Sequence, residues 1–396
     1  MDRNILIVSP FFPPIESVAT NRILSFAKYL DKYKTTVISL ENRSSEAKEE
    51  KFKVADDREV NVVRIPDNSF FKKATFKKKT NLLFHNLKAL YNRILLATML
   101  DEYDGWMKGV LSYLEKNRIS FDVIITSFAP ISSHLIGMEL KKRYPEKLWI
   151  ADMRDQMSSN IFFPLHYRKK IKPYEKEIVR YADCITAVSK PIIDDFKKIA
   201  EQTDKKIDFI EVRNGFDFEV EPDRYNPNKI FTVTYTGSFY GERNPENFFK
   251  ATEELIKNSS IVDIKIVFLG VAKPTKIPGI LKEKVIFRDR VSNEESIKIM
   301  KESDALLLIH PTTDIKGVYT GKLFEYIAVL RPIIALVDPQ DVAAELITLS
   351  GSGFISDNND LDGIKQNILK AYKVWSGEIN FNPDLEVVNS CKRIYQ

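Results

Sequence analysis

Along the chain, short apolar runs rich in β-branched residues alternate with longer segments whose apolar residues recur at helical spacing. In the first part, the runs that predict buried strands lie at 5–8, 36–40, 60–65, 123–126, 148–151 and 184–188. Helical spacing occupies several of the intervals between them, as at 21–32 and 132–144. Continuous apolar strands separated by helices are typical of a parallel sheet covered on both faces. The first part therefore predicts an α/β domain.

The same pattern starts again in the second part of the chain. The predicted strands there lie at 231–236, 263–269, 285–287, 305–309 and 333–337, with helices at 245–258 and 293–301. Between the two series, 214–228 carries an Asn-Gly pair, two prolines and several acidic residues, which is typical of a linker. Two Rossmann-like α/β domains, at 1–214 and 228–382, are therefore expected to face each other across a cleft. We expect 383–396 to form one more helix that packs back on the N-terminal domain.

Length and composition agree with two soluble cores. A chain of 396 residues is long for one core, and its hydrophobic fraction of 44% is ordinary. Two isolated cysteines, Cys184 and Cys391, form no disulfide framework, which fits a reducing compartment. The apolar run at 5–8 is too short for a signal peptide, and no run of about 18 apolar residues follows. We therefore expect a cytoplasmic protein that does not span a membrane.

The segment 305–328 holds the strongest candidate for a ligand site. A buried strand ends at His310, a polar loop follows, and a helix begins near Thr320. Thr320 is a plausible N-cap, and Gly321 lets a ligand approach the first amides of the helix. Free N–H groups and the helix dipole favour an anion such as a diphosphate.

Two charged residues in this helix extend the prediction. Lys322 adds a positive charge in the first turn, and the carboxylate of Glu325 suits the two hydroxyls of a ribose. The alternative is that Lys322 and Glu325 form an exposed ion pair of little energetic weight. The segment is not a Walker A loop, because its spacing differs and no Ser or Thr follows the Lys.

The run Gly-Lys-Leu-Phe-Glu-Tyr-Ile-Ala-Val-Leu-Arg-Pro-Ile-Ile-Ala at 321–335 resembles the donor-site signature of GT-B glycosyltransferases of family 4. The likeness is strongest to bacterial members that assemble capsule and lipopolysaccharide sugars. Weaker fragments follow the family's order along nearly the whole chain, at 5–14, 122–131, 151–155, 182–189, 213–217 and 235–238. The resemblance implies a transferase with the GT-B fold and a nucleotide-sugar donor.

The resemblance assigns roles in the second domain. Glu325 matches the second Glu of the family's Glu-x7-Glu motif, which holds the nucleotide ribose, whereas Gly317 stands in place of the first, sugar-binding Glu. Gly237 and Ser238 match the turn after the first strand of the domain. Relatives commonly carry a diphosphate-binding Arg and then a Lys in this turn, and Ser238 and Arg243 stand in their places. An Arg can neutralise and fork to a phosphate. The alternative for Arg243 is a solvated charge in a loop.

In the first domain, Arg154 and Asp155 follow a predicted strand, where ligands of such sheets bind. Many relatives have a His at the position of Arg154. An Arg stays protonated and cannot be a base, but it can stabilise a leaving phosphate or orient an acceptor. The alternative is a structural ion pair of Arg154 with Asp155 or with Asp152.

The loop at 13–22 precedes the first helix of this domain. Relatives usually have glycines here that approach the donor phosphates, and this chain has Ser17 and Ala19 instead. We expect Ser17 and Arg22 to contribute to donor binding and Thr20 to cap the helix.

No metal or dinucleotide cofactor is implied by the sequence. No Asp-x-Asp follows a strand in the manner of metal-dependent transferases, and no Gly-x-Gly-x-x-Gly follows the first strand. His85, His134 and His166 show no metal-ligand spacing and are interpreted as surface or core residues.

A basic stretch without acidic residues lies between the third and fourth predicted strands. From 68 to 100 there are seven Lys or Arg and no Asp or Glu, with aromatic residues beside the lysines and helical apolar spacing after them. This pattern favours peripheral contact of 70–95 with an anionic membrane. A nucleic-acid patch is disfavoured, because no binding module accompanies it. The remaining alternative is a solvated loop beside a core helix.

The sequence thus predicts a retaining, metal-independent hexosyltransferase. It would move a sugar from a nucleoside-diphosphate sugar to a hydroxyl of a glycan or lipid-linked acceptor, in cell-surface polysaccharide or glycolipid assembly. One alternative is a sugar-nucleotide 2-epimerase of the same fold, with Asp152, Asp155 or Glu16 in acid–base roles. The other is a catalytically weak nucleotide-binding subunit, which the departures at Gly317, Ser238 and Arg154 favour.

Overall fold

The structure is a computed structural model that describes residues 3–396 except 43, 68–99, 204, 223–224, 240–242, 272–275 and 311–315. The chain divides into two compact units, Met1–Val212 and Arg213–Gln396. The basic stretch predicted to contact a membrane, 70–95, and His85 within it lie outside the described residues.

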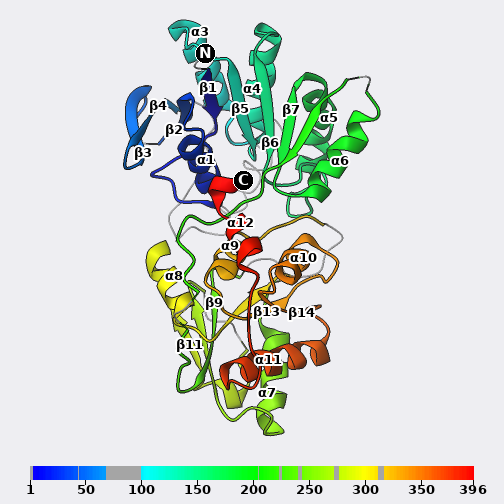
Figure 1. Cartoon of the computed structure of the whole chain (residues 1–396). Helices are drawn as coiled ribbons and strands as arrows, with labels where there is room; N and C mark the ends of the chain where they lie inside the picture. The colour runs from blue at the N-terminus through cyan, green and yellow to red at the C-terminus, as the bar shows by residue number, and fades with distance from the viewer. Residues whose placement is uncertain are drawn as a thin grey trace, which may run out of the picture. The chain divides into compact units, whose positions relative to one another are not determined.

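The first unit contains an eight-stranded sheet in the order β3-β4-β2-β1-β5-β6-β7-β8, parallel except for β3 (Figure 1). Its strands are β1 Asn4–Val8, β2 Lys34–Glu41, β3 Lys48–Ala55, β4 Arg58–Pro66, β5 Val123–Phe128, β6 Leu148–Met153, β7 Cys184–Ala187 and β8 Asp208–Glu211. The described helices are α1 Val18–Tyr29, α3 Asp104–Asn117, α4 Ile131–Arg143, α5 Leu165–Tyr181 and α6 Lys190–Ala200.

Alternating residues of each strand supply the two faces of this sheet. Ile5 and Ile7 of β1 pack in a cluster with Ile23 of α1, whereas Leu6 and Val8 pack in a larger cluster with α3 and α4. Both faces of the central strands are therefore buried. This explains why those strands have continuous apolar runs instead of alternating ones.

The second unit contains a parallel six-stranded sheet in the order β11-β10-β9-β12-β13-β14. Its strands are β9 Phe231–Thr236, β10 Ile264–Leu269, β11 Val285–Arg288, β12 Ala305–Ile309, β13 Ile333–Leu336 and β14 Gly353–Ser356. The described helices are α7 Glu246–Lys257, α8 Asn293–Lys301, α9 Gly321–Ala328, α10 Val342–Leu349, α11 Leu361–Trp375 and α12 Leu385–Ser390.

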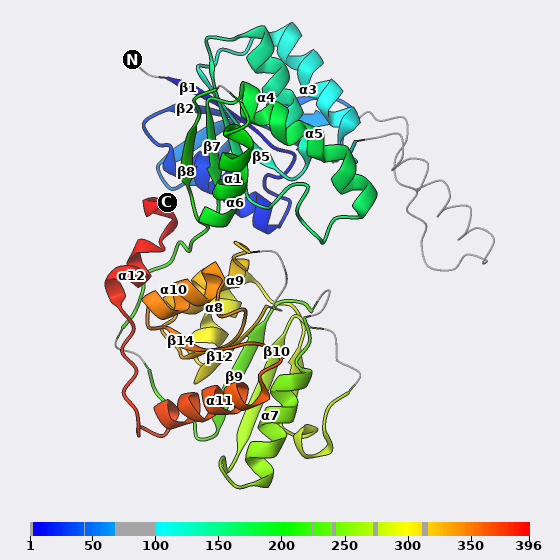
Figure 2. The same cartoon turned by 90° about the vertical axis from the view of Figure 1, so that its right-hand side faces the viewer.

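Helices cover both faces of the second sheet as well. Helices α7 and α11 share one apolar cluster with the strands, and α8, α9, α10 and α12 share the other (Figure 2). The α/β fold class with two Rossmann-like domains, predicted from the strand pattern, is confirmed.

The C-terminal helix belongs to the second unit, whereas 383–396 was expected to pack back on the N-terminal domain. Val388 and Cys391 are fully buried in the same cluster as α9. Lys392 pairs with Phe216 in an isolated parallel bridge, which holds the end of the chain to the start of the unit. Periodicity detects such a helix but not the surface that its apolar side covers.

Among the described residues, no helix is both long and apolar enough to cross a bilayer.

Candidate functional site

The end of β9 and the start of α9 meet in the second unit, and Lys322 joins them. Its Nζ donates a hydrogen bond to the carbonyl oxygen of Thr236 and lies 3.6 Å from the centre of the Tyr235 ring. Burial and the nearby Arg243 lower the pKa of Lys322 to about 7, although Glu325 opposes this shift. No ion pair links Lys322 to a carboxylate of the described residues. Among the described residues the ammonium group thus lacks a carboxylate partner, which leaves it suited to an anionic ligand.

Gly237 has the backbone conformation and the small size that this arrangement needs. Its φ of +96° lies in the left-handed region, which disfavours other residues. A Cβ at this position would lie 3.3 Å from the Nζ of Lys322. Gly237 therefore keeps open the space next to the ammonium group.

Arg243 lies beside Lys322 and is hydrogen-bonded to His310. The guanidinium of Arg243 is buried, and its Nη2 lies 2.8 Å from Nδ1 of His310, which follows the last residue of β12. Because an Arg only donates, Nδ1 of His310 accepts this bond and the imidazole is neutral. Burial and the charges of Arg243 and Lys322 lower the pKa of His310 to about 4. His310 thus fixes Arg243 without adding charge.

The N-terminus of α9 leaves polar groups available in the same region. Thr320 occupies the N-cap position, as predicted, but its side chain makes no capping hydrogen bond. Its Oγ1 is buried and lacks a partner among the described residues. Gly321, the first residue of the helix, is exposed. An anion placed here would meet free amides, a buried hydroxyl and the positive end of the helix dipole.

Glu325 lies one turn further along α9 and is partly buried. Burial raises the pKa of its carboxyl group, and Arg393, a hydrogen bond from Asn293 and Lys322 act in the opposite direction. The i,i+3 ion pair of Lys322 and Glu325, the alternative reading of this segment, does not form. The carboxylate remains suited to accept hydroxyl donors.

Gly317, which replaces the family's sugar-binding Glu, has a φ of +90°. Its amide donates a 2.6 Å hydrogen bond to Oδ1 of Asp341, a residue of the loop before α10. A Glu would be strained in this conformation. The backbone conformation at position 317 therefore favours Gly.

Ser238 lies next to Gly237 and is exposed. Its Oγ donates a 3.3 Å hydrogen bond to the carbonyl oxygen of Gly270, at the end of the neighbouring strand β10. Ser238 therefore supports the turn between the two strands and brings no charge to it.

In the first unit, Arg22 is buried against Asp152 and does not project into solvent. Nε of Arg22 donates to Oδ2 of Asp152 at 2.8 Å and Nη2 donates to Oδ1 at 2.5 Å. Ser127 and Thr186 also donate to this carboxylate, at 2.7 and 2.8 Å. Burial alone would raise the pKa of Asp152, but Arg22 and the two hydroxyls outweigh it and hold that pKa below its usual range. The pair joins α1 to β5, β6 and β7.

Arg154, directly after β6, pairs with its neighbour Asp155. Its Nη1 lies 3.4 Å from Oδ2 of Asp155, and its Nη2 donates to the carbonyl oxygen of Ala129 at 3.2 Å. Asp152, the other carboxylate considered for this pair, binds Arg22 instead. Burial raises the pKa of Asp155, with Arg154 acting against it. Arg154 keeps part of its side chain exposed, so a ligand can still reach the guanidinium.

Helix α1 is capped by Ser17, whereas Thr20 was expected in that role. Oγ of Ser17 accepts a 3.0 Å hydrogen bond from the amide of Thr20 and lies 2.9 Å from its hydroxyl. Because the helix begins at Val18, Thr20 lies inside its first turn. The hydroxyl of Ser17 therefore has a structural partner in the described structure.

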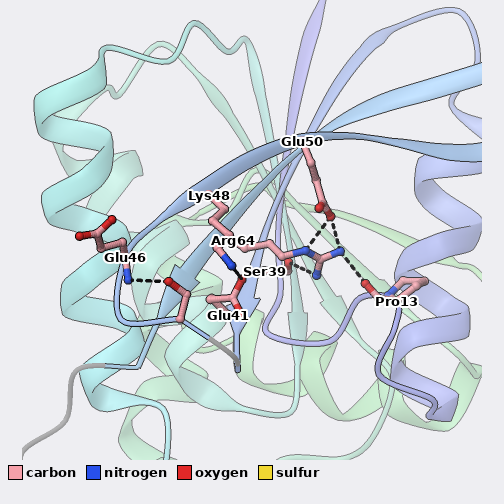
Figure 3. Close-up of polar contacts among 8 residues, drawn as sticks. Pro13, Ser39, Glu41, Glu46, Lys48, Glu50 and Arg64 are labelled. Atoms are coloured by element: carbon pink, nitrogen blue, oxygen red, sulfur yellow. Dashed lines mark hydrogen bonds and ion pairs between the residues drawn. The ribbon is translucent and has the colours of Figure 1, made fainter.

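Arg64, a residue that the sequence did not single out, fixes the loop before α1. Its guanidinium is buried and donates to the carbonyl oxygen of Pro13 at 2.7 Å, to Glu50 at 2.7 Å and to Ser39 at 3.4 Å (Figure 3). The bonds tie the loop to β2, β3 and β4. The sequence feature that could have revealed this residue is an Arg within an otherwise apolar predicted strand.

Among the described residues, no group of three or more His, Cys, Asp or Glu side chains is arranged so that it could hold a metal ion. His134 is a core residue, hydrogen-bonded to Thr126 at 2.7 Å, and His166 is exposed on α5.

Similarity to known proteins appears at the level of structure. No family model and no curated protein matches the chain. A trehalose-phosphate synthase (UDP-forming) from Burkholderia xenovorans superposes with a TM-score of 0.61 at 10% identity, over 99% of this chain and 97% of the other. A glycosyltransferase from Rickettsia africae gives 0.59 at 13%, over 100% and 96%. The lipopolysaccharide outer core galactosyltransferase WaaB gives 0.54 at 12%, over 99% and 96%.

The chain has the GT-B fold. The match covers the whole length of both partners, so it includes both Rossmann-like units. In this structure Lys322, Arg243 and His310 lie near the carboxyl ends of β9 and β12, where open α/β sheets bind ligands.

Proposed function

We propose that the protein is a glycosyltransferase that uses a nucleoside-diphosphate sugar as donor. The observation that carries the proposal is the cluster of Lys322 and Arg243 beside the open N-terminus of α9, where no carboxylate of the described residues pairs with Lys322. Similarity of fold to a UDP-forming synthase and to two other sugar transferases supports the donor class.

In the proposed reaction, an acceptor hydroxyl oxygen bonds to the anomeric carbon of the sugar as the bond from that carbon to the diphosphate breaks. Lys322, Arg243 and the amides at Thr320 and Gly321 stabilise the charge that develops on the leaving diphosphate. Glu325 holds the ribose, while Gly237 and Ser238 shape the turn beside the phosphates. The proton of the acceptor passes to the leaving phosphate, so no side chain has to act as base.

The first unit contributes Arg154 and Asp155 to this proposal. Arg154 has an exposed part and a fixed position, which suit it to contact the departing phosphate or the acceptor. Donor contacts of Ser17 and Arg22 have less support, because both side chains are engaged within the unit. Retention of configuration, transfer of a hexose, independence of metal, and a role in cell-surface polysaccharide or glycolipid assembly remain parts of the proposal drawn from the family resemblance.

The test is transfer from a panel of radiolabelled nucleotide sugars, with product analysis in the presence and absence of acceptors. Transfer supports the proposal. Formation of a 2-epimer without acceptor would replace it with the epimerase alternative, whose acid–base role Asp152 serves poorly because four hydrogen bonds occupy its carboxylate. Binding without turnover under every condition would favour the nucleotide-binding subunit.

Glu325→Ala tests the ribose contact. Loss of two hydroxyl hydrogen bonds should weaken nucleotide binding by roughly 1–3 kcal/mol. Isothermal titration with the nucleotide and with its 2′,3′-dideoxy form measures this, since the substitution should abolish the preference for the hydroxylated form. Unchanged affinity for UDP, GDP and ADP alike would remove Glu325 from the site.

A further inference from the structure

A turn on the first unit displays apolar side chains at the beginning of α5. Ile161, Phe162 and Leu165 are 47%, 53% and 61% exposed. These three large apolar residues, which we call the apolar patch, lie within five positions of the chain, whereas exposed apolar residues on most surfaces stand singly.

The turn is held rigidly from its inner side. Oδ1 of the buried Asn160 accepts a 3.0 Å hydrogen bond from the amide of Phe162. Phe163 turns inward, with its ring 6.0 Å from that of Phe128 and 5.3 Å from that of Tyr167. The exposed side chains are thus presented by a fixed backbone.

A stripe of basic residues continues from this patch along α5. Lys169, Lys172, Lys176 and Arg180 are all exposed, and together with Leu165 they follow one another at intervals of three or four residues. Residues at this spacing lie on one side of a helix. The apolar patch and the stripe therefore form one surface, which we call the α5 surface (Ile161, Phe162, Leu165, Lys169, Lys172, Lys176 and Arg180).

The acidic residues of α5 lie off this stripe. Glu175 accepts hydrogen bonds from the amide and hydroxyl of Ser158, at 2.7 and 2.9 Å, and faces the protein. Glu177 lies 3.8 Å from Arg180. Lys172 acts electrostatically on Glu175, but within the described part of the chain none of the three lysines forms a close ion pair with a carboxylate.

We propose that the α5 surface docks on an anionic lipid bilayer, with Ile161, Phe162 and Leu165 entering the interface and the basic stripe lying against the head groups. Cations near an anionic leaflet and apolar side chains below it are the two contributions that hold peripheral proteins on membranes. A soluble polyanion would use the lysines but would gain nothing from the apolar patch, so the combination favours lipid. This inference does not depend on sugar transfer, and its test measures no transfer.

The experiment is co-sedimentation of the full chain with vesicles of phosphatidylcholine alone and of phosphatidylcholine with phosphatidylglycerol. The substitutions Lys169→Gln, Lys172→Gln and Lys176→Gln together should weaken binding to the anionic vesicles on the order of 100-fold. Phe162→Ser with Leu165→Ser should weaken it by a similar factor. The segment 70–95 stays unchanged in every variant.

A matched control carries the same charge change on the second unit, with Lys250→Gln, Lys282→Gln and Lys373→Gln, all at exposed positions. It should bind like the unaltered protein. Circular dichroism and the melting temperature of each variant show that the fold is retained.

Three outcomes would overturn the inference. Undiminished binding of both α5 variants would assign any membrane contact to another part of the chain. Equal loss in the matched control would indicate an effect of net charge alone. Loss in the lysine variant but not in the serine variant, together with the same pattern against inorganic polyphosphate, would indicate a soluble polyanion as the partner.

Discussion

At the residue scale, the candidate donor site depends on the unusual environment of Lys322. Its ammonium group is packed on an aromatic ring and a carbonyl oxygen and has a basic neighbour, Arg243, but forms no ion pair with a carboxylate of the described residues. Burial of such a lysine destabilises the protein without ligand, and the charge of a bound anion offsets that destabilisation. Perturbed groups of this kind cluster at functional sites.

Nucleotide-sugar binding should therefore take up a proton near neutral pH. Lys322, with a pKa of about 7, is half neutral at pH 7 in the free protein, and a bound diphosphate favours its charged form. We expect affinity for a nucleotide sugar, whose diphosphate does not titrate in this range, to fall as pH rises from 6 to 8. Isothermal titration in buffers of different ionisation enthalpy measures the uptake, and Lys322→Arg should remove it. A pH-independent affinity would contradict this account.

The same lowered pKa affects stability with a definite sign. Between about pH 7 and the ordinary pKa of lysine, the unfolded chain binds more protons at Lys322 than the folded one, so the free energy of unfolding should rise with pH there. Lys322→Met should flatten this rise and stabilise the empty protein by roughly 1 kcal/mol while weakening nucleotide binding. Urea unfolding at pH 7 and 9 checks both signs.

The pair of Arg22 and Asp152 gives a second test at this scale. Removing one member leaves the other charge buried, which costs about 3–5 kcal/mol. We expect Arg22→Met to destabilise the protein by that amount and Arg22→Met with Asp152→Asn to recover part of it, as measured by urea unfolding. Retained stability with lost donor binding would instead make Arg22 a donor contact.

At the element scale, the connection between β9 and α9 is the feature that forms the site. The hydroxyl of Tyr326 accepts a 2.9 Å hydrogen bond from the amide of Thr236 and shares a 3.2 Å hydrogen bond with the hydroxyl of Thr236, which joins the strand to the helix. The left-handed Gly237 then turns the chain away from the ammonium group. Neither element alone would place a cation beside an open helix N-terminus.

Gly237→Ala should therefore destabilise the second unit and weaken nucleotide binding. Two glycines provide matched controls: Gly377 also has a positive φ, and Gly279 has an ordinary one, and a Cβ would meet nothing within 4 Å at either. Gly377→Ala should cost about 1 kcal/mol and Gly279→Ala less, both without effect on binding. Thermal unfolding and nucleotide titration compare the three. Equal binding by all three variants would place the donor elsewhere.

At the scale of the whole molecule, two separate cores imply two separable responses to ligand. The apolar clusters of the first unit and those of the second contain no common residue. A nucleotide bound only by residues of the second unit stabilises that unit by mass action, by about 2.7 kcal/mol at a concentration of 100 times Kd.

Scanning calorimetry should accordingly show two unfolding transitions, and nucleotide should raise the midpoint temperature of one of them. Glu325→Ala should abolish that shift, whereas Arg154→Gln should preserve it when the nucleotide carries no sugar. A shift of both transitions together by nucleotide alone would show that the two units unfold as one or share the nucleotide.

Much of the fold follows from the sequence by itself. The strands at 231–236 and 305–309 have the predicted bounds, because buried parallel strands read as unbroken apolar runs. Strand β3 was missed, since its exposed Lys and Glu residues give no apolar signal at the sheet edge. The start of α9 at Thr320 and Gly321 was predicted correctly, because a helix N-terminus is a local feature of consecutive residues. The donor-site roles of Lys322 and Glu325 remain predictions.

Tertiary structure alone decided the partners of the charged residues. Arg22 and Asp152 are 130 positions apart, and Arg243 and His310 are 67 apart, so no local pattern could pair them. Arg22, which was expected to contact the donor, is part of a buried network with Asp152. His310 holds Arg243 through a hydrogen bond. The sequence determined which segments form most of the strands and where a helix begins at a candidate ligand site, because both depend on neighbouring residues. Which charges remain available to that ligand was decided by folding, because burial and distant neighbours set their partners and their pKa values.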